Sequence, residues 1–219
     1  MTRPGRSWGE PLAPDATLVE VAGRDGDLAA AALGRRDAVL VFLPDPTSDF
    51  ARAVGLVPGR AGTGDTVVAC DLMDLGHGRG AVNMVVSGTP PDRQRVWHRL
   101  RPVVVAVDGR IVADEPALTV VVANGQFLRG ADLVPRGHPG DGRLEVQVYA
   151  LRPRERAGMR RRLAAGNHVP HPRIVQAAGR RVEIRWAQGE RGLEVDGRPG
   201  ASVGALSVEV LPGAARLLV

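Results

Sequence analysis

Along the first sixty residues, two hydrophobic patterns alternate, one typical of strands and one typical of helices. The first strand-like segment alternates apolar with polar side chains, and an Ala-rich helical segment follows it. The second strand-like segment is continuously apolar, and a short helical segment follows it. In chain order the predicted elements are a strand at 17–22, a helix at 28–33, a strand at 38–43 and a helix at 50–54. Asp27 is the candidate N-cap of the first helix, and Ser48 or Asp49 that of the second. This order predicts an α/β unit with parallel strands.

After Gly64 the pattern changes to short, mostly Val-rich strands separated by Gly and Pro turns. The predicted strands are 66–70, 81–86, 103–107, 111–113, 117–123, 144–150, 181–186, 192–195, 205–211 and 214–219. Two predicted helices interrupt them, at 92–100 and 154–165. Asp108-Gly109, between two apolar runs, favours a two-residue hairpin, and strands at this spacing predict an antiparallel sandwich or barrel. The predicted divisions are an irregular arm at 1–16, an α/β unit at 17–62 and a larger β domain at 63–219.

The composition bounds the class of protein. The 219 residues are 44% hydrophobic and 24% charged, which is ordinary for a soluble globular protein with a sizeable core. No run approaches the ~20 apolar residues that span a bilayer, and no apolar segment of a secretory signal follows the first residues. Cys70 is the single cysteine, which excludes an internal disulfide and fits a reducing cytoplasm.

The positive charge of the chain comes from arginine alone. All 29 basic residues are arginines, and the net charge is +5, which favours anionic partners such as nucleotides, nucleic acids or anionic lipid surfaces. No nucleic-acid-binding motif is present, and 3% aromatic residues leave few rings for base stacking, so no nucleic-acid partner is expected. Arg160-Arg-Arg162 is either a solvated helix face or a contact to an anionic bilayer, where each arginine contributes about 1 kcal/mol.

Three Gly-containing turns are candidates for chemistry. Gly23-Arg-Asp-Gly-Asp27 suits a phosphate because it opens a helix, although an ordinary strand-to-helix turn has the same pattern. Its carboxylates would repel phosphate unless a divalent cation bridges them. Gly62-Thr-Gly-Asp65 lacks the lysine and the spacing of a P-loop, which indicates a linker. Val195-Asp-Gly-Arg198 is a hairpin turn, in which Asp196 is a candidate general base if a cleft faces it.

The C-terminal half carries a series of motifs in a fixed order. They are Val121-Val-Ala-Asn-Gly-Gln-Phe127, Gly130-Ala-Asp-Leu-Val-Pro135, Gly140-Asp-Gly-Arg-Leu-Glu-Val146, Gly166-Asn-His168, Ala178-Gly-Arg-Arg-Val-Glu-Ile184, Val195-Asp-Gly197 and the closing segment 208–219. This series resembles the diacylglycerol kinase and sphingosine kinase-like lipid kinases, a superfamily that shares its fold with NAD kinase. The resemblance is specific because order and spacing both hold from residue 121 to residue 219.

The N-terminal half resembles the same family more loosely. Asp49-Phe-Ala-Arg-Ala-Val-Gly-Leu56 is similar to the family's NDFARALGL, which places 43–48 on its PlGTGN nucleotide loop and 23–27 on its GGDGT phosphate loop. Both loops depart from the family pattern, since 43–48 lacks the two glycines and the asparagine. Arg24 and Asp27 stand where the family has a glycine and the threonine of GGDGT.

Other departures affect the surroundings of the implied cleft. Arg198 replaces the glutamate of the family's DGE turn, which reverses a charge beside Asp196. The family's opening strand–helix unit has no counterpart before residue 17, and its helical insert is reduced to residues 89–102. An exposed sheet edge left by the missing unit would invite pairing, which leaves a homodimer open.

The resemblance implies a fold and a set of site residues. The implied fold is a truncated α/β nucleotide-binding lobe followed by a larger antiparallel β-sandwich domain. The implied roles are Gly23 and Gly26 as a phosphate cradle, Asp25 near the nucleotide's metal, Asp49 and Arg52 as a charged network beside the nucleotide, Asp196 as the base for the lipid hydroxyl, and Asp141 as a ligand of a structural Mg²⁺.

The implied activity is transfer of the γ-phosphate of ATP, with Mg²⁺, to a lipid hydroxyl at a membrane surface. The alternative is a pseudokinase of the same fold that binds lipid or a protein partner without catalysis, because the departures gather in the nucleotide loops. Diacylglycerol, a sphingoid base and a polyprenyl-type alcohol all remain open as the lipid. The expected location is cytoplasmic, with peripheral attachment to a membrane left open.

Overall fold

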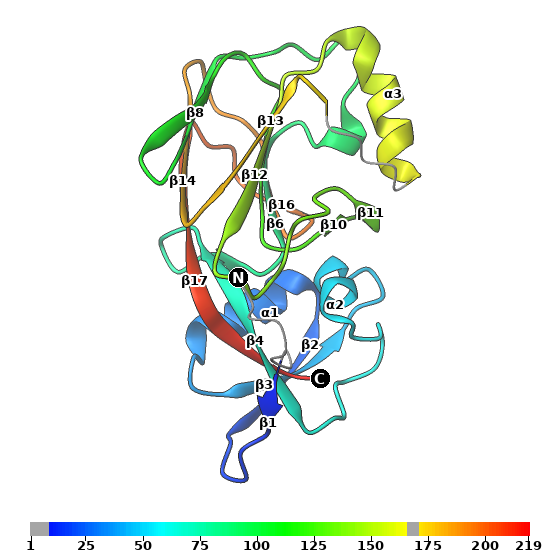
Figure 1. Cartoon of the computed structure of the whole chain (residues 1–219), viewed down its shortest axis with the longest axis vertical. Helices are drawn as coiled ribbons and strands as arrows, with labels where there is room; N and C mark the ends of the chain where they lie inside the picture. The colour runs from blue at the N-terminus through cyan, green and yellow to red at the C-terminus, as the bar shows by residue number, and fades with distance from the viewer. Residues whose placement is uncertain (1–8, 166–170) are drawn as a thin grey trace.

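The computed structural model describes residues 9–165 and 171–219. The first half of the predicted arm and the motif at 166–168 therefore lie outside the described residues. Figure 1 shows an elongated molecule with a small α/β lobe at one end and β layers with helix α3 (Pro153–Ala164) at the other. Strands β4 (Thr66–Asp74) and β17 (Ala205–Leu218) run side by side between the two parts.

The predicted α/β order at the N-terminus is confirmed. β2 (Leu18–Gly23) and β3 (Val39–Pro44) pair in parallel, with α1 (Asp25–Gly34) between them and α2 (Asp49–Val54) after them. Ser48 is the N-cap of α2, because its hydroxyl accepts the N–H of Ala51 at 3.0 Å.

Helix α1 begins earlier than the sequence predicted. Arg24 is its N-cap, so Asp27 stands at the third helical position and the prediction of Asp27 as the cap is wrong. The carboxylate of Asp27 instead reaches back and accepts the N–H of Arg24 at 2.8 Å. Gly23, with a φ of +132°, lets the chain turn from strand to helix without a longer connection.

A nine-stranded sheet connects the lobe to the β domain. Besides β2, β3, β4 and β17 it contains β1 (Glu10–Pro11), β5 (Gly80–Ala81), β7 (Val103–Val107), β8 (Arg110–Asp114) and β14 (Arg181–Trp186). Its main path is β1-β4-β17-β14-β7-β8, and the lobe joins through β3, which lies parallel to β17. The two strands predicted at 205–211 and 214–219 form the single strand β17, whose register shifts between Leu211 and Ala215.

A six-stranded sheet forms the second layer of the β domain. In spatial order its strands are β13 (Ile174–Gly179), β12 (Leu144–Tyr149), β9 (Thr119–Ala123), β6 (Met84–Gly88), β15 (Leu193–Val195) and β16 (Arg198–Pro199). All its pairs are antiparallel. One aliphatic core, mainly valine, fills the space between the sheets, and α3 packs Met159 and Leu163 in another core with side chains of this second sheet. The predicted β-sandwich is confirmed.

The predicted helix at 92–100 is wrong. A single 3-10 turn, η1 (Pro91–Arg93), is present there, and residues 95–100 form a bend without regular structure. Side chains of α3 hold this irregular segment: the guanidinium of Arg156, which is 1% exposed, donates to the carbonyls of residues 95, 96 and 98, while Arg160 donates to that of Gln94. These bonds satisfy carbonyls that have no partner in a helix or strand. In the described part of the chain, no helix is long and apolar enough to cross a membrane.

Candidate nucleotide cleft

A cavity of about 350 Å³ lies where the α/β lobe meets the β-sandwich, a size typical of ligand sites. Its lining comes from residues 24–25, 46–49 with Arg52, 129–130 and 196–198. Four of the site residues expected from the resemblance line it, namely Asp25, Asp49, Arg52 and Asp196. The fold thus brings four segments that are separate in the sequence to one cavity.

The loop before α1 supplies the start of a helix and a buried carboxylate. At the start of α1 the N–H groups of Asp25 and Gly26 have no acceptor within the helix, whereas those of Asp27 and Leu28 donate to the carbonyl of Arg24. Asp25, 4% exposed, accepts the hydroxyl of Ser48 and the N–H of Phe50, the latter at 3.0 Å, so it ties α1 to α2. Burial raises the pKa of Asp25, which the hydrogen bonds from Ser48 and Phe50 oppose.

Asp49 has its carboxylate turned toward the β domain. It accepts the N–H groups of Arg129 and Gly130, the second at 2.7 Å, which form the turn between β10 (Phe127–Leu128) and β11 (Ala131–Asp132). The guanidinium of Arg52, one helical turn further along α2, lies 5.6 Å from the ring centre of Phe127 in the same hairpin. Asp49 and Arg52 therefore hold the hairpin against α2 at the wall of the cavity.

Asp196 lies at the first turn position between β15 and β16 with a φ of +48°. Its two oxygens accept three backbone N–H groups, those of Val82 and Asn83 at 3.0 Å and of Met84 at 2.9 Å. Burial, together with the charge of Asp25, raises the pKa of Asp196 to about 7, although the three N–H donors lower it. A carboxylate with this pKa is half ionised near neutral pH.

Two of the departures from the family pattern are paired in space. The guanidinium of Arg198 binds both oxygens of Asp27, at 2.6 and 3.1 Å, across the edge of the cavity. The same guanidinium lies near Gly26, where an added Cβ would be 3.9 Å from its nearest atoms. The bond with Arg198, more than any other contact, lowers the pKa of Asp27. The negative charge that Asp27 brings to the phosphate loop is thus compensated by the positive charge that Arg198 brings to the turn.

We expect this ion pair to contribute little to stability. The side chains of Arg198 and Asp27 are 44% and 40% exposed, and exposed pairs contribute up to ~1 kcal/mol. A double-mutant cycle with Asp27→Asn and Arg198→Gln, followed by urea unfolding, should give a coupling energy below ~1 kcal/mol that decreases as salt is added. The exposed pair Arg181 and Glu183 serves as a control. A coupling above ~2 kcal/mol, unaffected by salt, would contradict the expectation.

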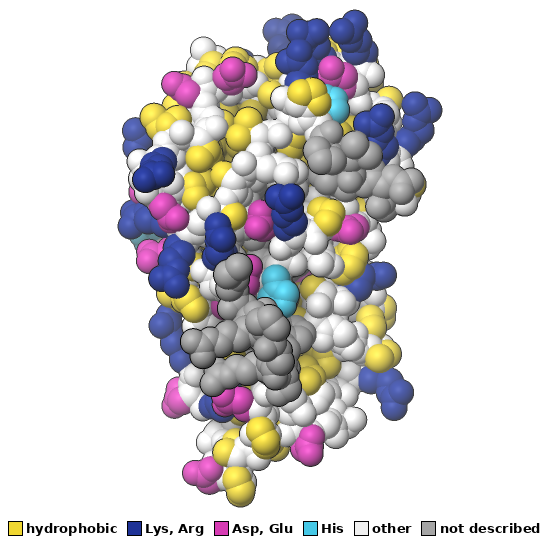
Figure 2. Space-filling view, viewed as in Figure 1, with side chains coloured by type: hydrophobic (Ala, Val, Ile, Leu, Met, Phe, Trp, Pro, Cys, Tyr) yellow, Lys and Arg dark blue, Asp and Glu magenta, His cyan; other side chains and the backbone are white. Residues whose placement is uncertain are grey.

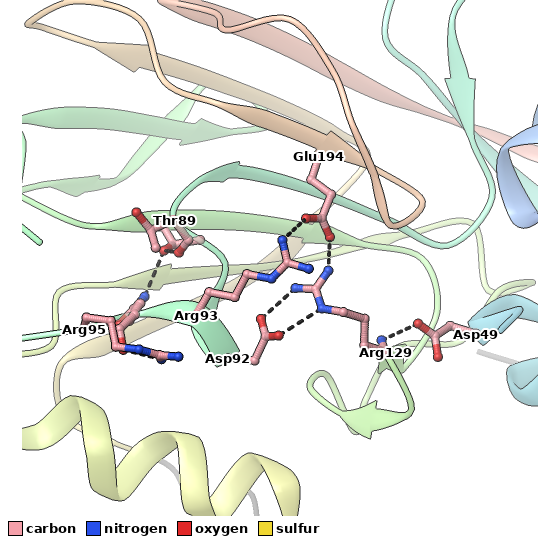
Figure 3. A network of polar contacts seen from close by, with 9 residues as sticks. Asp49, Thr89, Asp92, Arg93, Arg95, Arg129 and Glu194 are labelled. Carbon is pink, nitrogen blue, oxygen red and sulfur yellow. Dashed lines mark hydrogen bonds and ion pairs between the residues drawn. The ribbon is translucent and has the colours of Figure 1, made fainter.

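A network of charges that the sequence did not reveal lies beside the cavity (Figure 3). Arg129, at a φ of +50°, donates to both oxygens of Asp92 at 2.7 and 2.9 Å and to the carboxylate of Glu194. Arg93 approaches the other oxygen of Glu194 at 4.0 Å. Burial lowers the pKa of Arg129, but the bonds to Asp92 and Glu194 outweigh burial and raise it. The network connects η1, the β10–β11 hairpin and β15.

Asp141 is not among the residues that line the cavity. Its Oδ1 accepts the N–H of Arg143 at 3.0 Å in a tight turn. Nearby, Asp71 accepts the N–H groups of Gly142 at 2.6 Å and Gly213 at 2.9 Å. Within residues 9–165 and 171–219, no group of three or more His, Cys, Asp or Glu side chains is placed to hold a metal ion. The structural Mg²⁺ at Asp141 therefore stays a prediction from the resemblance alone.

Comparison with known proteins identifies relatives of this fold. Residues 94–219 match the YegS C-terminal NAD kinase beta sandwich-like domain. Three solved structures from Bacillus anthracis str. Sterne, each described as a diacylglycerol kinase, superpose with TM-scores of 0.74 to 0.76 at 18 to 20% sequence identity. Each covers 92% of this chain and 75 to 77% of its own, so the likeness extends over both the lobe and the β domain and shows a common fold. No curated protein matches the chain.

Proposed function

The chain belongs to the family of YegS C-terminal NAD kinase beta sandwich-like domains, and from this premise we propose that it is a diacylglycerol kinase-like lipid kinase. It would transfer the γ-phosphate of ATP to a lipid hydroxyl at a membrane surface. One observation carries the proposal. The loops at 23–27, 43–49 and 195–198, which resemble the family's nucleotide and catalytic motifs, meet at one cavity with arginines and three buried carboxylates around it.

The lining of the cavity fits a polyphosphate. Arg24, Arg52, Arg129 and Arg198 all line it, and the start of α1 adds N–H groups on a loop where Gly23 and Gly26 carry no side chain. Guanidinium groups and free helix amides are the donors that phosphate oxygens accept in proteins. We propose Gly23, Gly26 and Arg24 as the phosphate-binding part. Asp49 and Arg52 act indirectly, by fixing the hairpin that presents Arg129 and Gly130.

Asp25 and Asp196 are the proposed acidic groups. Asp25 accepts hydrogen bonds from the hydroxyl of Ser48 and from the N–H groups of Phe50 and Asp49. A carboxylate has about four acceptor positions, so one lone pair is left that could face the Mg²⁺ of a nucleotide. A bound Mg²⁺ would supply neutralisation of phosphate charge. Oδ2 of Asp196 accepts a single N–H, which leaves one lone pair for the proton of a lipid hydroxyl, and a pKa of about 7 suits a general base at neutral pH.

The non-catalytic alternative also has an observation in its favour. Asp196 is 7% exposed and already holds three backbone N–H groups, so an equally consistent role is to fix the turn of β15–β16. Arg198 lies where the family has an acidic residue. In this alternative the cavity would bind an anionic ligand, and no phosphate would be transferred.

Calorimetry with Mg²⁺·ATP tests the proposal. The wild type is compared with Arg24→Glu, which reverses a charge at the cavity, and with Arg36→Glu, a matched change at the exposed end of α1. We expect the wild type and Arg36→Glu to bind equally and Arg24→Glu to bind at least about tenfold more weakly. Saturating ATP, at about a hundred times Kd, should stabilise the wild type by about 2.7 kcal/mol.

Transfer is then measured with γ-labelled ATP and diacylglycerol in mixed micelles. Label that moves to the lipid supports the kinase, and binding without transfer to diacylglycerol, a sphingoid base or a polyprenyl alcohol supports the non-catalytic alternative. If wild type does not bind ATP at millimolar concentration, the nucleotide site is refuted.

A further inference from the structure

Two large apolar side chains are exposed in the segment that follows η1. Trp97 is 71% exposed and its neighbour Val96 56%, while His98 packs edge-on to the indole ring at 6.0 Å. A tryptophan is seldom left this exposed by a folded protein, because its ring has a large apolar surface. Neither side chain contributes to the cavity or to a core of the described residues.

The segment that carries Trp97 is held in place by its backbone. Arg156 of α3 donates to the carbonyls of Arg95 at 2.6 Å, Val96 at 3.2 Å and His98 at 2.8 Å, and Arg160 donates to the carbonyl of Gln94. Arg156 is 1% exposed and donates to backbone carbonyls. The fold thus uses a buried arginine to present Val96 and Trp97 outward in one fixed conformation.

The surroundings of Trp97 are positively charged. Between residues 93 and 101 the chain has four arginines and no Asp or Glu, and α3 lies against η1 with Arg160-Arg-Arg162 in its last turns. Figure 2 shows basic side chains gathered at the end of the molecule that carries α3. The exposed apolar side chains of Val96 and Trp97, with arginines beside them in the sequence, match the surface of an anionic bilayer. Such a surface has negatively charged headgroups outside and hydrocarbon beneath them.

We propose that this surface, the Trp97 patch, formed by Arg95, Val96, Trp97, Arg99 and Arg160, docks on an anionic lipid bilayer. Trp97 and Val96 enter the interfacial layer, where the amphipathic indole ring is favoured, and the arginines contact lipid phosphates. Each arginine near such a surface strengthens binding by about fivefold. An oppositely charged nucleic acid is less well matched, because Val96 adds apolar surface that no phosphate backbone would cover.

The position of the patch relates it to the cavity. Asp92 of η1 binds Arg129, which lines the cavity, and Trp97 follows five residues after Asp92 (Figure 3). Docking through the patch would therefore place the side of the cavity nearest η1 close to the bilayer. That the cavity gains access to a lipid substrate in this way rests on the proposed function. The binding of the patch to a bilayer requires neither nucleotide nor phosphate transfer.

Vesicle flotation without nucleotide tests the patch. Vesicles of phosphatidylcholine are compared with vesicles that also contain phosphatidylglycerol. The variants are Trp97→Ala and the double variant Arg95→Gln/Arg99→Gln. The controls are Ile111→Ala, which removes an apolar side chain that is 65% exposed on β8, and Arg35→Gln/Arg36→Gln at the end of α1. All these side chains are exposed, so each variant should fold, which a thermal melt verifies.

We expect the wild type and both controls to bind the anionic vesicles at least about tenfold better than neutral ones. Trp97→Ala should weaken this binding several-fold, and the double arginine variant about 25-fold, since two arginines are lost. Brominated lipid should quench tryptophan emission of the wild type more than that of Trp97→Phe.

Equal vesicle binding by Trp97→Ala and Ile111→Ala would overturn the proposal. It would also be overturned if the protein floated with neither kind of vesicle and Trp97→Ala instead converted a dimer to a monomer. Binding of duplex DNA without binding of vesicles would overturn it as well. A wild type that binds ATP but no vesicles refutes the patch alone, whereas a wild type that binds anionic vesicles but no ATP refutes the nucleotide site alone.

Discussion

The protein is expected to lose stability as the pH rises from about 4 to above 7, because of Asp196. The pKa of this carboxyl is raised to about 7 in the folded state, from 3.8 as its ordinary value. Between these values the folded state binds a proton that the unfolded state has released, so the free energy of unfolding decreases with pH. The stabilisation is complete below about pH 4 and is lost as the pH passes 7. The resulting decrease in the free energy of unfolding is at most about 4 kcal/mol.

Urea unfolding at pH 5 and pH 8 measures this effect. Asp196→Asn removes the titration and keeps a side chain that tolerates a positive φ, so its difference between the two pH values should be less than half that of wild type. Some difference should remain, because burial also raises the pKa of Asp25 and of Asp71. Asp108→Asn serves as a control, since backbone hydrogen bonds lower the pKa of Asp108 and place its titration below the range. A wild type equally stable at both pH values would show that Asp196 remains ionised.

Replacing Asp49 by alanine should destabilise the fold by about 2–4 kcal/mol. The carboxylate is 8% exposed and accepts the N–H groups of Arg129 and Gly130, so its removal breaks two part-buried hydrogen bonds. A hydrogen bond to a charged group contributes about 1.5–3 kcal/mol, and water at this exposed turn offsets part of the loss. The hairpin β10–β11 consists of two-residue strands, and without this anchor its remaining contact with α2 is that of Phe127 with the guanidinium of Arg52.

Urea unfolding with Asp49→Asn and Asp37→Ala as companions checks this expectation. Asparagine keeps one acceptor oxygen and should lose about half of the effect. Asp37 is exposed at the end of the α1–β3 connection, so its replacement should change nothing measurable. If Asp49→Ala were as stable as the wild type but failed to bind ATP, Asp49 would contact the nucleotide directly. A destabilised variant that still binds ATP would confirm its role as an anchor.

Local patterns in the sequence predicted much of the β architecture. The continuous apolar run of β7 and the alternation of apolar with charged side chains in β14 located both strands to the residue, because one face of each strand packs into the sandwich core. Asp108-Gly109 and Asp196-Gly197 were predicted as two-residue turns, and both pairs have a positive φ, which Asp and Gly tolerate. These strands and turns are determined by residues that are neighbours in the sequence, so they could be predicted from the sequence alone.

Features made by distant residues escaped prediction. The segment 92–100 was predicted as a helix, but it is irregular, and Arg156, some sixty residues later, binds its carbonyls. The β10–β11 hairpin has no hydrophobic pattern from which it could be predicted. It is held by Asp49 of the other lobe, which accepts the N–H of Gly130. Likewise, Asp27 and Arg198 read separately as two unfavourable substitutions, and only their contact shows that each balances the other.

The long strand β17 has a consequence for how the chain acquires its structure. Its first half pairs with β14 in the sandwich, and its second half brings Leu217 alongside Leu40 of β3 and buries Ala215 and Leu217 in the core of the lobe. The lobe that begins at β2 is thus completed by residues made almost two hundred positions later. During synthesis, α1, α2 and their two strands must wait with an open core until β17 leaves the ribosome. Such long-range closure is slow, and the apolar surface of the unfinished lobe stays exposed until it is complete.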